Sequence, residues 1–232
     1  IALQDSKGFN PYKFGFGAAS DSHNTAVPYR QNNFFGGHTF SDATIEVRNS
    51  GMLVGGMFDA RPEGTAGLPG VWAEENTRAS LFEAMKRKET FAVTGPHIQV
   101  RLFGGWEYSA DMLASKDWVK TAYAKGVPMG GDLPAAGSKA PTFLVWGLKD
   151  PSSGNLDRIQ IVKGWTKSGQ SFEKVYDVIW AGDRKPDKWT GLVPPIGSTV
   201  DLESASYTNA IGAVELKTVW LDPEFVPDLI AF

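Results

Sequence analysis

The feature that most constrains the fold of this chain is a period-two alternation of polar and apolar residues that begins after Gly95. Successive side chains of a strand point to opposite faces of a sheet, so each alternating run predicts a half-buried strand. Turn-forming residues such as those at 150–152 separate the runs. The runs lie at 97–103, 142–148, 156–162, 172–180 and, in a shorter form, 198–202. Several strands with no helix between them predict an antiparallel β-sandwich over residues 96–232.

Residues 1–95 follow a different pattern. The stretch at 10–19 predicts a turn and then a buried strand, which runs directly into Ser20, Asp21, Ser22 and His23. In an α/β barrel, catalytic groups collect at such strand ends. Residues 25–70 are rich in Gly, Asn and Pro and predict an irregular loop, with one short strand at 45–47.

The clearest helix of the chain is expected after this loop. Asn76 or Thr77 is suited to cap its first turn, because short polar side chains accept hydrogen bonds from free backbone N–H groups. The expected apolar face is made by Leu81, Phe82 and Met85. The basic run 86–88 falls in the last turn, where the helix dipole favours cations. This position explains the basic run without an anion site.

Composition excludes several classes of protein. A net charge of −3 gives no electrostatic footprint for nucleic acid. No apolar run approaches the roughly 20 residues that cross a bilayer, and no signal sequence is visible at the N-terminus. With no Cys, the chain has neither disulfides nor a thiolate metal site. Hydrophobic residues make up 42% of the chain, which is enough for a buried core.

Asp21-x-His23 is the motif with the clearest chemistry. Residues i and i+2 of a strand point to the same side, so the two side chains can converge on one site. A carboxylate and a neutral imidazole are both good ligands for Zn, Mn or Fe. The same residues have a structural interpretation, in which Asp21 caps a turn and His23 lies on the surface. The motif alone leaves both interpretations open.

The surroundings of the motif resemble the PHP (polymerase and histidinol phosphatase) superfamily. The segment Asn10-Pro11-Tyr12-Lys13-Phe14-Gly15, followed by Ala18-Ala19-Ser20-Asp21-Ser22-His23, is similar to the final metal-binding strand of those proteins. Further similar segments lie at 33–36, 70–78, 82–90, 94–96, 126–133, 156–165 and 207–212. Together they resemble one large bacterial branch of the superfamily, a domain of unknown function. The similarity extends along nearly the whole chain.

This resemblance implies a fold and a chemistry. The expected fold class is α+β, with the C-terminal portion of a distorted PHP-like α/β barrel at 1–95 and the antiparallel β-sandwich at 96–232. The family's final motif places its aspartate and histidine on different metals, so Asp21 and His23 are the expected metal ligands. The implied cofactors are divalent Zn, Mn or Fe ions. The implied activity is metal-dependent hydrolysis, with a phosphoester as the expected small-molecule substrate.

This sequence departs from the family pattern in one respect. The family's other metal ligands include an early His-x-His motif, and this sequence contains no His-x-His. The resemblance therefore implies that the N-terminal part of the barrel precedes Ile1 and that a last strand follows Phe232. Since part of a barrel would expose apolar surface, we expect self-association or association with the missing N-terminal part. Related proteins often carry export signals, which suggests a periplasmic or extracytoplasmic location.

Three further residues are candidates for substrate binding. His38 lies in a glycine-rich loop, and Arg30 and Arg78 have guanidinium groups suited to a phosphate. Each has a simpler interpretation: Arg78, for example, lies where it can pair with Glu74 or Glu75. A rival hypothesis for the whole chain is a non-catalytic binding or interaction module in which the β-sandwich is the working part. A third is a proteolytic remnant that associates with its missing half.

Overall fold

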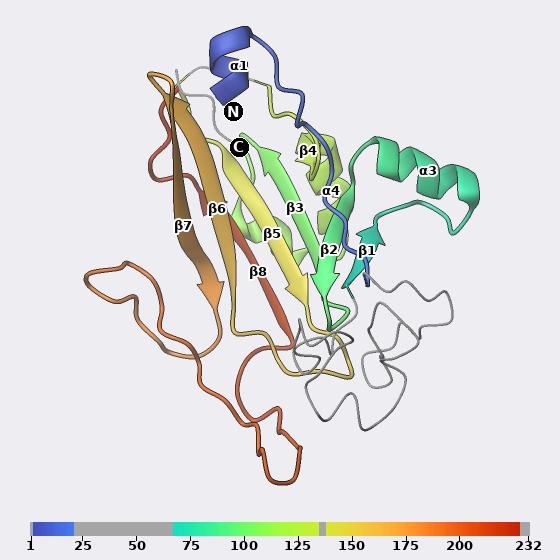
Figure 1. The fold of residues 1–232 in the computed structure, drawn as a ribbon, viewed down its shortest axis with the longest axis vertical. Coiled ribbons are helices and arrows are strands. Elements are labelled where there is room, and N and C mark those ends of the chain that lie inside the picture. Colours follow the sequence, from blue (N-terminus) through green and yellow to red (C-terminus); the bar gives the residue numbers. More distant parts are fainter. Residues whose placement is uncertain (1, 21–66, 135–137, 228–232) are drawn as a thin grey trace, which may run out of the picture. The chain divides into compact units, whose positions relative to one another are not determined.

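The computed structural model describes residues 2–20, 67–134 and 138–227 (Figure 1). The chain divides into two compact units, one formed by residues 1–14 and 99–232 and the other by residues 15–98. Antiparallel sheets predominate and helices are few, so the sheet-rich α+β character is confirmed. The described residues form no closed barrel. The domain assignment of 1–95 and 96–232 stays a prediction.

The first unit is built on a four-stranded antiparallel sheet with the strand order β4-β3-β5-β8 (Figure 1). Its strands are β3 (Gln99–Gly105), β4 (Gly126–Pro128), β5 (Thr142–Leu148) and β8 (Glu215–Leu221). The registers place Phe103 beside Leu144 and Leu144 beside Val219. These three side chains therefore lie in one row on the same face of the sheet.

Helices cover that face of the sheet. The 3-10 helix η4 (Ala110–Ala114) and the helix α4 (Trp118–Lys125) follow β3, and their apolar side chains pack on Phe103 and Leu144. The buried Tyr108 hydroxyl donates a hydrogen bond of 2.7 Å to the carbonyl of Ala122. Burial raises the pKa of Tyr108 to about 12. A Cβ atom at Gly126 would lie 2.2 Å from the Tyr108 hydroxyl, so this position requires glycine.

The opposite face of the sheet carries a hairpin made by β6 (Arg158–Lys167) and β7 (Gln170–Trp180). Ser168 and Gly169 form its turn, and both have positive φ, as a type I′ turn requires. Ile159 of β6 packs over Gly147 of β5. Tyr176 of β7 contacts Trp220 of β8, with ring centroids 5.1 Å apart. The sheet is therefore covered by helices on one face and by the hairpin on the other.

Ion pairs fasten the hairpin to the segment after β8. Lys163 lies 2.6 Å from Asp222, and both side chains are nearly buried. Glu224 accepts hydrogen bonds from Lys174 and from the Tyr176 hydroxyl. The hydrogen bond from Lys174, followed by that from Tyr176, holds the pKa of Glu224 below its usual range.

A second network, the arginine brace, ties the loop after β7 to the start of β6. Arg158 pairs with Asp157 at 3.0 Å and with the buried Asp177 at 3.2 Å. Arg184 donates to the Asp157 backbone carbonyl at 2.9 Å and lies 2.5 Å from its carboxylate. The Val193 N–H donates to Asp177, so both sides of the loop are anchored.

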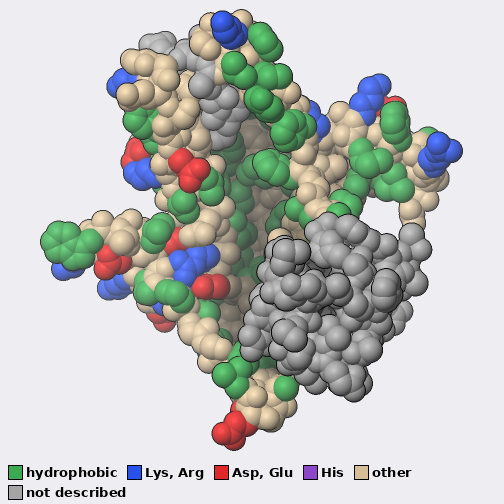
Figure 2. All heavy atoms as spheres, viewed as in Figure 1, with side chains coloured by type: hydrophobic (Ala, Val, Ile, Leu, Met, Phe, Trp, Pro, Cys, Tyr) green, Lys and Arg blue, Asp and Glu red, His purple; other side chains and the backbone are tan. Residues whose placement is uncertain are grey.

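The loop held by the arginine brace, residues 181–197, projects from the first unit (Figure 1). Its Trp189 side chain is 94% exposed. In the same unit, Leu202 on the following loop is 89% exposed. Figure 2 shows hydrophobic side chains at the ends of both projecting loops, with basic and acidic side chains interspersed near them.

The second unit contains a two-stranded antiparallel sheet and one helix in its described part. β1 (Gly67–Val71) pairs with β2 (Thr90–Thr94), and α3 (Arg78–Lys86) connects them. The Thr77 hydroxyl accepts a hydrogen bond of 3.3 Å from the Ser80 N–H, which confirms Thr77 as the cap. The basic residue Lys86 lies in the last turn of α3, as expected.

The expected apolar face of α3 is wrong in part. Ala84 is the buried residue of the helix, and Leu81 is half-buried. Phe82 and Met85 are instead 59% and 51% exposed. The packed side of the helix is therefore narrow, and the Ala84 carbonyl accepts a hydrogen bond of 3.1 Å from the Glu89 N–H.

Four other predictions need correction. Residues 10–19 form no buried strand, since Phe14 and Phe16 are 66% and 76% exposed. Helices η4 and α4 do intervene between strands of the first unit. The strand expected at 198–202 is only an isolated bridge between Asp201 and Ser206. Strand β1 begins at Gly67, inside the stretch 25–70 that was expected to be irregular. The strand expected at 45–47 lies outside the described residues. None of the described helices is long and apolar enough to cross a membrane.

We expect Leu144→Ala to lower the free energy of unfolding by about 2–5 kcal/mol, because Leu144 is fully buried between the sheet and α4. Urea denaturation followed by tryptophan fluorescence measures this change. Leu202→Ala is the matched control, since the same truncation at an exposed site should change the free energy by less than about 0.5 kcal/mol. Equal effects of the two substitutions would contradict the placement of the core.

We expect the stabilising effect of Asp157 to depend on pH. Burial alone would raise the pKa of Asp157, but hydrogen bonds and charges from Arg158 and Arg184 outweigh it and lower that pKa. A carboxylate with a lowered pKa in the folded state stabilises the protein above its unfolded pKa, and this stability is lost as pH falls through the folded pKa. Asp157→Asn should therefore destabilise by about 1 kcal/mol at pH 7, a value that allows for partial exposure.

This difference between the wild type and Asp157→Asn should shrink as the pH falls below about 4, where the carboxylate takes up its proton. Denaturation curves at several pH values test it. The control is Asp183→Asn, an exposed residue of the same loop, which should show a much smaller difference at every pH. A difference for Asp157→Asn that stays constant between pH 7 and pH 3 would contradict the linkage.

Candidate functional site

The predicted metal ligands Asp21 and His23 lie outside the described residues, as do Arg30 and His38. Of the five candidate residues, the structure describes Arg78 alone. Arg78 is the first residue of α3 and is exposed. The roles of the five candidates therefore stay predictions.

The segment that leads into Asp21 is described up to Ser20. It runs against the β1–β2 sheet, where Gly15 lies beside Thr90 and Gly17 beside Pro69. A Cβ atom at Gly67 would lie 2.4 Å from the carbonyl oxygen of Ala19. This close backbone approach needs glycine at 67, and it fixes the end of the segment against the first residue of β1.

Metal-ligating side chains do not gather elsewhere in the described part of the chain. Residues 2–20, 67–134 and 138–227 contain no group of three His, Cys, Asp or Glu that could hold an ion. Four acidic residues of the first unit, Asp157, Asp177, Asp222 and Glu224, are engaged in the arginine brace and in the ion pairs around Glu224. The described residues therefore offer no alternative to the predicted ligands.

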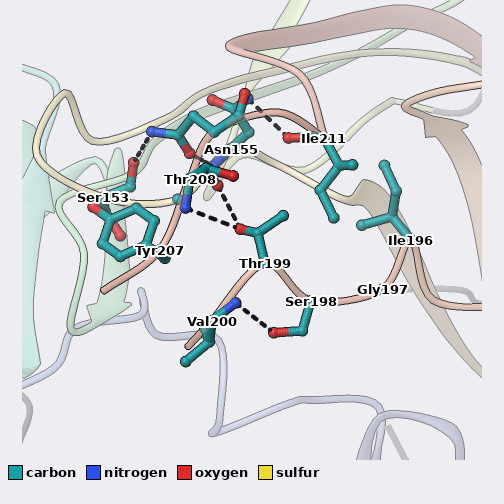
Figure 3. A pocket seen from close by; sticks show the side chains of 12 residues that line it. Ser153, Asn155, Ile196, Gly197, Ser198, Thr199, Val200, Tyr207, Thr208 and Ile211 are labelled. Carbon is teal, nitrogen blue, oxygen red and sulfur yellow. Dashed lines mark hydrogen bonds between the residues drawn. The ribbon is translucent and has the colours of Figure 1, made fainter. Parts of the chain in front are cut away.

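A hollow of about 320 Å³, which we call the polar hollow, opens on the first unit between two loops (Figure 3). One loop joins β5 to β6, and the other runs from residue 196 to residue 211 before β8. Ser153 and Tyr207 lie on one side in Figure 3, and Ile196 and Ile211 lie on the other. The lining residues are Ser153, Gly154, Asn155, Ile196, Gly197, Ser198, Thr199, Val200, Tyr207, Thr208, Asn209 and Ile211.

Hydrogen bonds cross-link the two walls of the polar hollow. The Asn155 N–H donates to the Asn209 side chain at 2.9 Å, and the Asn155 amide group donates to the carbonyls of Asn209 and Ile211. The Tyr207 hydroxyl donates to the Ser152 carbonyl at 3.0 Å, which holds its ring in place. A β-bridge between Leu156 and Ala213 closes the base of the two loops. The walls are therefore braced before any ligand arrives.

The arginine brace supports one wall of the polar hollow. Arg184 donates a hydrogen bond of 2.6 Å to the Pro194 carbonyl, two residues before Ile196. Gly212, with φ of 84°, follows Ile211, and a Cβ atom there would lie 2.6 Å from Asn155 Cβ. Glycine at 212 therefore allows the chain to turn away from Asn155 into β8.

Among the described residues, the twelve that line the polar hollow include no charged side chain. Hydroxyl and amide groups predominate, with three aliphatic side chains among them. The Asn155 Oδ1 atom is buried and accepts no hydrogen bond from any residue that the structure describes. Such an arrangement can bind a neutral, hydrogen-bonding molecule and offers nothing to neutralise an anion.

Sequence reasoning missed the polar hollow. Asn155 and Asn209, which connect its two walls, are 54 residues apart in the chain. A motif read over a short stretch of sequence cannot show that two such distant residues are in contact. The available signals were the polar clusters at 152–155 and 207–209, each of which also has the composition of an ordinary turn.

No curated protein and no solved structure matches this chain. A family model does match, over residues 1–232, and it is described as a protein of unknown function, DUF3604. Because this match covers the whole sequence, the chain belongs to the DUF3604 family.

Proposed function

We propose that this chain is part of a metal-dependent hydrolase, with Asp21 and His23 among its metal ligands. The observation that carries the proposal is the Asp21-x-His23 pair, which follows directly on an extended segment held against the β1–β2 sheet. A carboxylate and an imidazole separated by one residue suit Zn, Mn or Fe. The similarity of the surrounding segments to PHP proteins supports the same assignment.

The proposed chemistry is hydrolysis of a phosphoester. A bound divalent ion supplies Lewis-acid activation of water and of the ester. Asp21 contributes a negative charge that sets the affinity of the site, and His23 contributes a neutral nitrogen ligand. Arg78, at the start of α3, and Arg30 and His38 are proposed to contact the phosphate, for which guanidinium is well suited. The resemblance puts the remaining ligands, including His-x-His, outside this sequence.

The proposed architecture is a PHP-like barrel portion followed by a β-sandwich. In the first unit, the β6–β7 hairpin packs on the face of the four-stranded sheet through Ile159 and Tyr176. Two layers of strands in face-to-face contact support a sandwich as the finer description. In the second unit, α3 connects β1 to β2, and these two strands pair antiparallel, unlike the parallel strands of a regular α/β barrel.

We expect the purified chain to carry stoichiometric Zn, Mn or Fe, since a carboxylate and an imidazole are competent ligands. The Asp21→Ala/His23→Ala double variant should lose that metal. Plasma mass spectrometry of both proteins measures the content, and Asp183→Ala controls for the loss of a surface carboxylate. Hydrolysis of p-nitrophenyl phosphate should follow the metal content. Absence of metal from both proteins would refute the proposal for this polypeptide.

We also propose that the second unit associates with another copy or with the missing part of a barrel. In its described residues the only buried apolar side chain is Ala84. Phe16, Phe82 and Met85 are each more than half exposed. Large apolar side chains gathered in one small unit typically mark an interaction surface.

Self-association predicts a dimer or larger species in light scattering at micromolar concentration. Phe82→Ser/Met85→Ser should shift the protein towards the monomer, because both side chains lie exposed on α3. Trp189→Ser/Leu202→Ser removes exposed apolar surface of similar size from the first unit and should leave the distribution unchanged. A monodisperse wild-type monomer would count against self-association.

A further inference from the structure

We propose that the polar hollow of the first unit binds a neutral, polyhydroxylated ligand, that is, a sugar. This inference goes beyond the hydrolytic function, because the hollow belongs to the first unit while Asp21 and His23 belong to the second. Its volume of about 320 Å³ is at the lower end of the range for small-molecule sites, so a monosaccharide is the expected size of ligand.

The hydrogen-bonding groups of the hollow match a polyol. A sugar hydroxyl donates one hydrogen bond and accepts others, so it needs partners of both kinds. Asn209 lines the hollow, and its Oδ1 accepts one hydrogen bond from the Asn155 N–H, which leaves a second lone pair for a ligand donor. Ser198 accepts a hydrogen bond from the Val200 N–H, which leaves its own hydroxyl hydrogen for a ligand.

The apolar groups of the hollow match the C–H face of a sugar ring. Tyr207 is 46% exposed, and its hydroxyl is committed to the Ser152 carbonyl, so its ring lies in a fixed orientation at one side of the hollow (Figure 3). Ile196 and Ile211 lie at the other side. An aromatic ring with its polar end satisfied is a suitable surface for an amphipathic ligand.

The charge of the hollow excludes the most obvious alternative. A phosphorylated metabolite needs a guanidinium, an ammonium or a helix N-terminus to neutralise it. None of these lines the hollow among the residues that the structure describes. The ligand is therefore a neutral sugar and not the phosphoester proposed as substrate for the metal site. The hollow is open, which predicts weak binding with a dissociation constant on the order of 1 mM.

Nuclear magnetic resonance of the ¹⁵N-labelled full chain tests this proposal. The probes are methyl α-glucoside, methyl α-mannoside and methyl β-galactoside, each titrated to about 50 mM to exceed the expected dissociation constant. At least one sugar should shift the backbone amides of 153–155 and 198–209 in a saturable way. Glucose 6-phosphate, which adds charge to the same ring, should shift them at least tenfold more weakly. All titrations are made with EDTA, so loss of the metal site does not affect the result.

Two arginine substitutions locate the binding site. Val200 lines the hollow and is 58% exposed, so Val200→Arg should fill the hollow without disturbing the fold. Leu202, two residues away and 89% exposed, is not a lining residue, so Leu202→Arg adds the same charge outside the hollow. Affinity should fall at least tenfold in Val200→Arg and stay unchanged in Leu202→Arg.

Three outcomes would overturn the proposal. They are the absence of saturable shifts with all three sugars, equal binding of glucose 6-phosphate, and undiminished binding in Val200→Arg. A chain that binds a sugar but carries no metal would support the hollow and refute the hydrolase. A chain that carries metal but binds no sugar would do the reverse.

Discussion

Strand β5 is the element on which the first unit depends, because its two faces serve two different layers. Leu144 is fully buried beneath α4, while Gly147 on the opposite face lies under Ile159 of the hairpin. Hydrogen bonds to β3 and β8 leave it no free edge. Each neighbouring layer is positioned by its contact with β5. The loop that leaves the C-terminal end of β5 is therefore held in a defined position. This loop forms one wall of the polar hollow, so the position of that wall follows from the packing of the sheet.

The strands that could be predicted were those bounded by clear turn residues. The run at 142–148 gives β5 with the bounds observed, because it is a short, mostly apolar run that ends just before the turn residues 150–152. Helix α4 was missed because it is only 8 residues long and its apolar pattern spans barely two turns. Phe82 and Met85 were misassigned because apolar spacing on a helix reports which side chains share a face. It does not report whether that face is covered.

The two candidate sites differ in whether their residues lie close together in the sequence. Asp21 and His23 are separated by one residue, so the amino-acid sequence alone is enough to identify their motif. The polar hollow depends instead on Asn155 meeting Asn209 and on the bridge between Leu156 and Ala213. Those contacts form only when β8 pairs with β5 and brings the preceding loop back across the sheet. A polar cluster in the sequence gives no sign of this partner.

The absence of charge in the hollow is as informative as the groups that line it. The first unit has acidic and basic side chains close by, yet Asp157, Arg158 and Arg184 are used to brace the loop behind the hollow. Their charges are satisfied within the protein, and the face offered to a ligand consists of amides, hydroxyls and aliphatic groups. A site for an anion would place at least one of these arginines at its surface. The brace therefore makes the hollow rigid without altering its selectivity for neutral ligands.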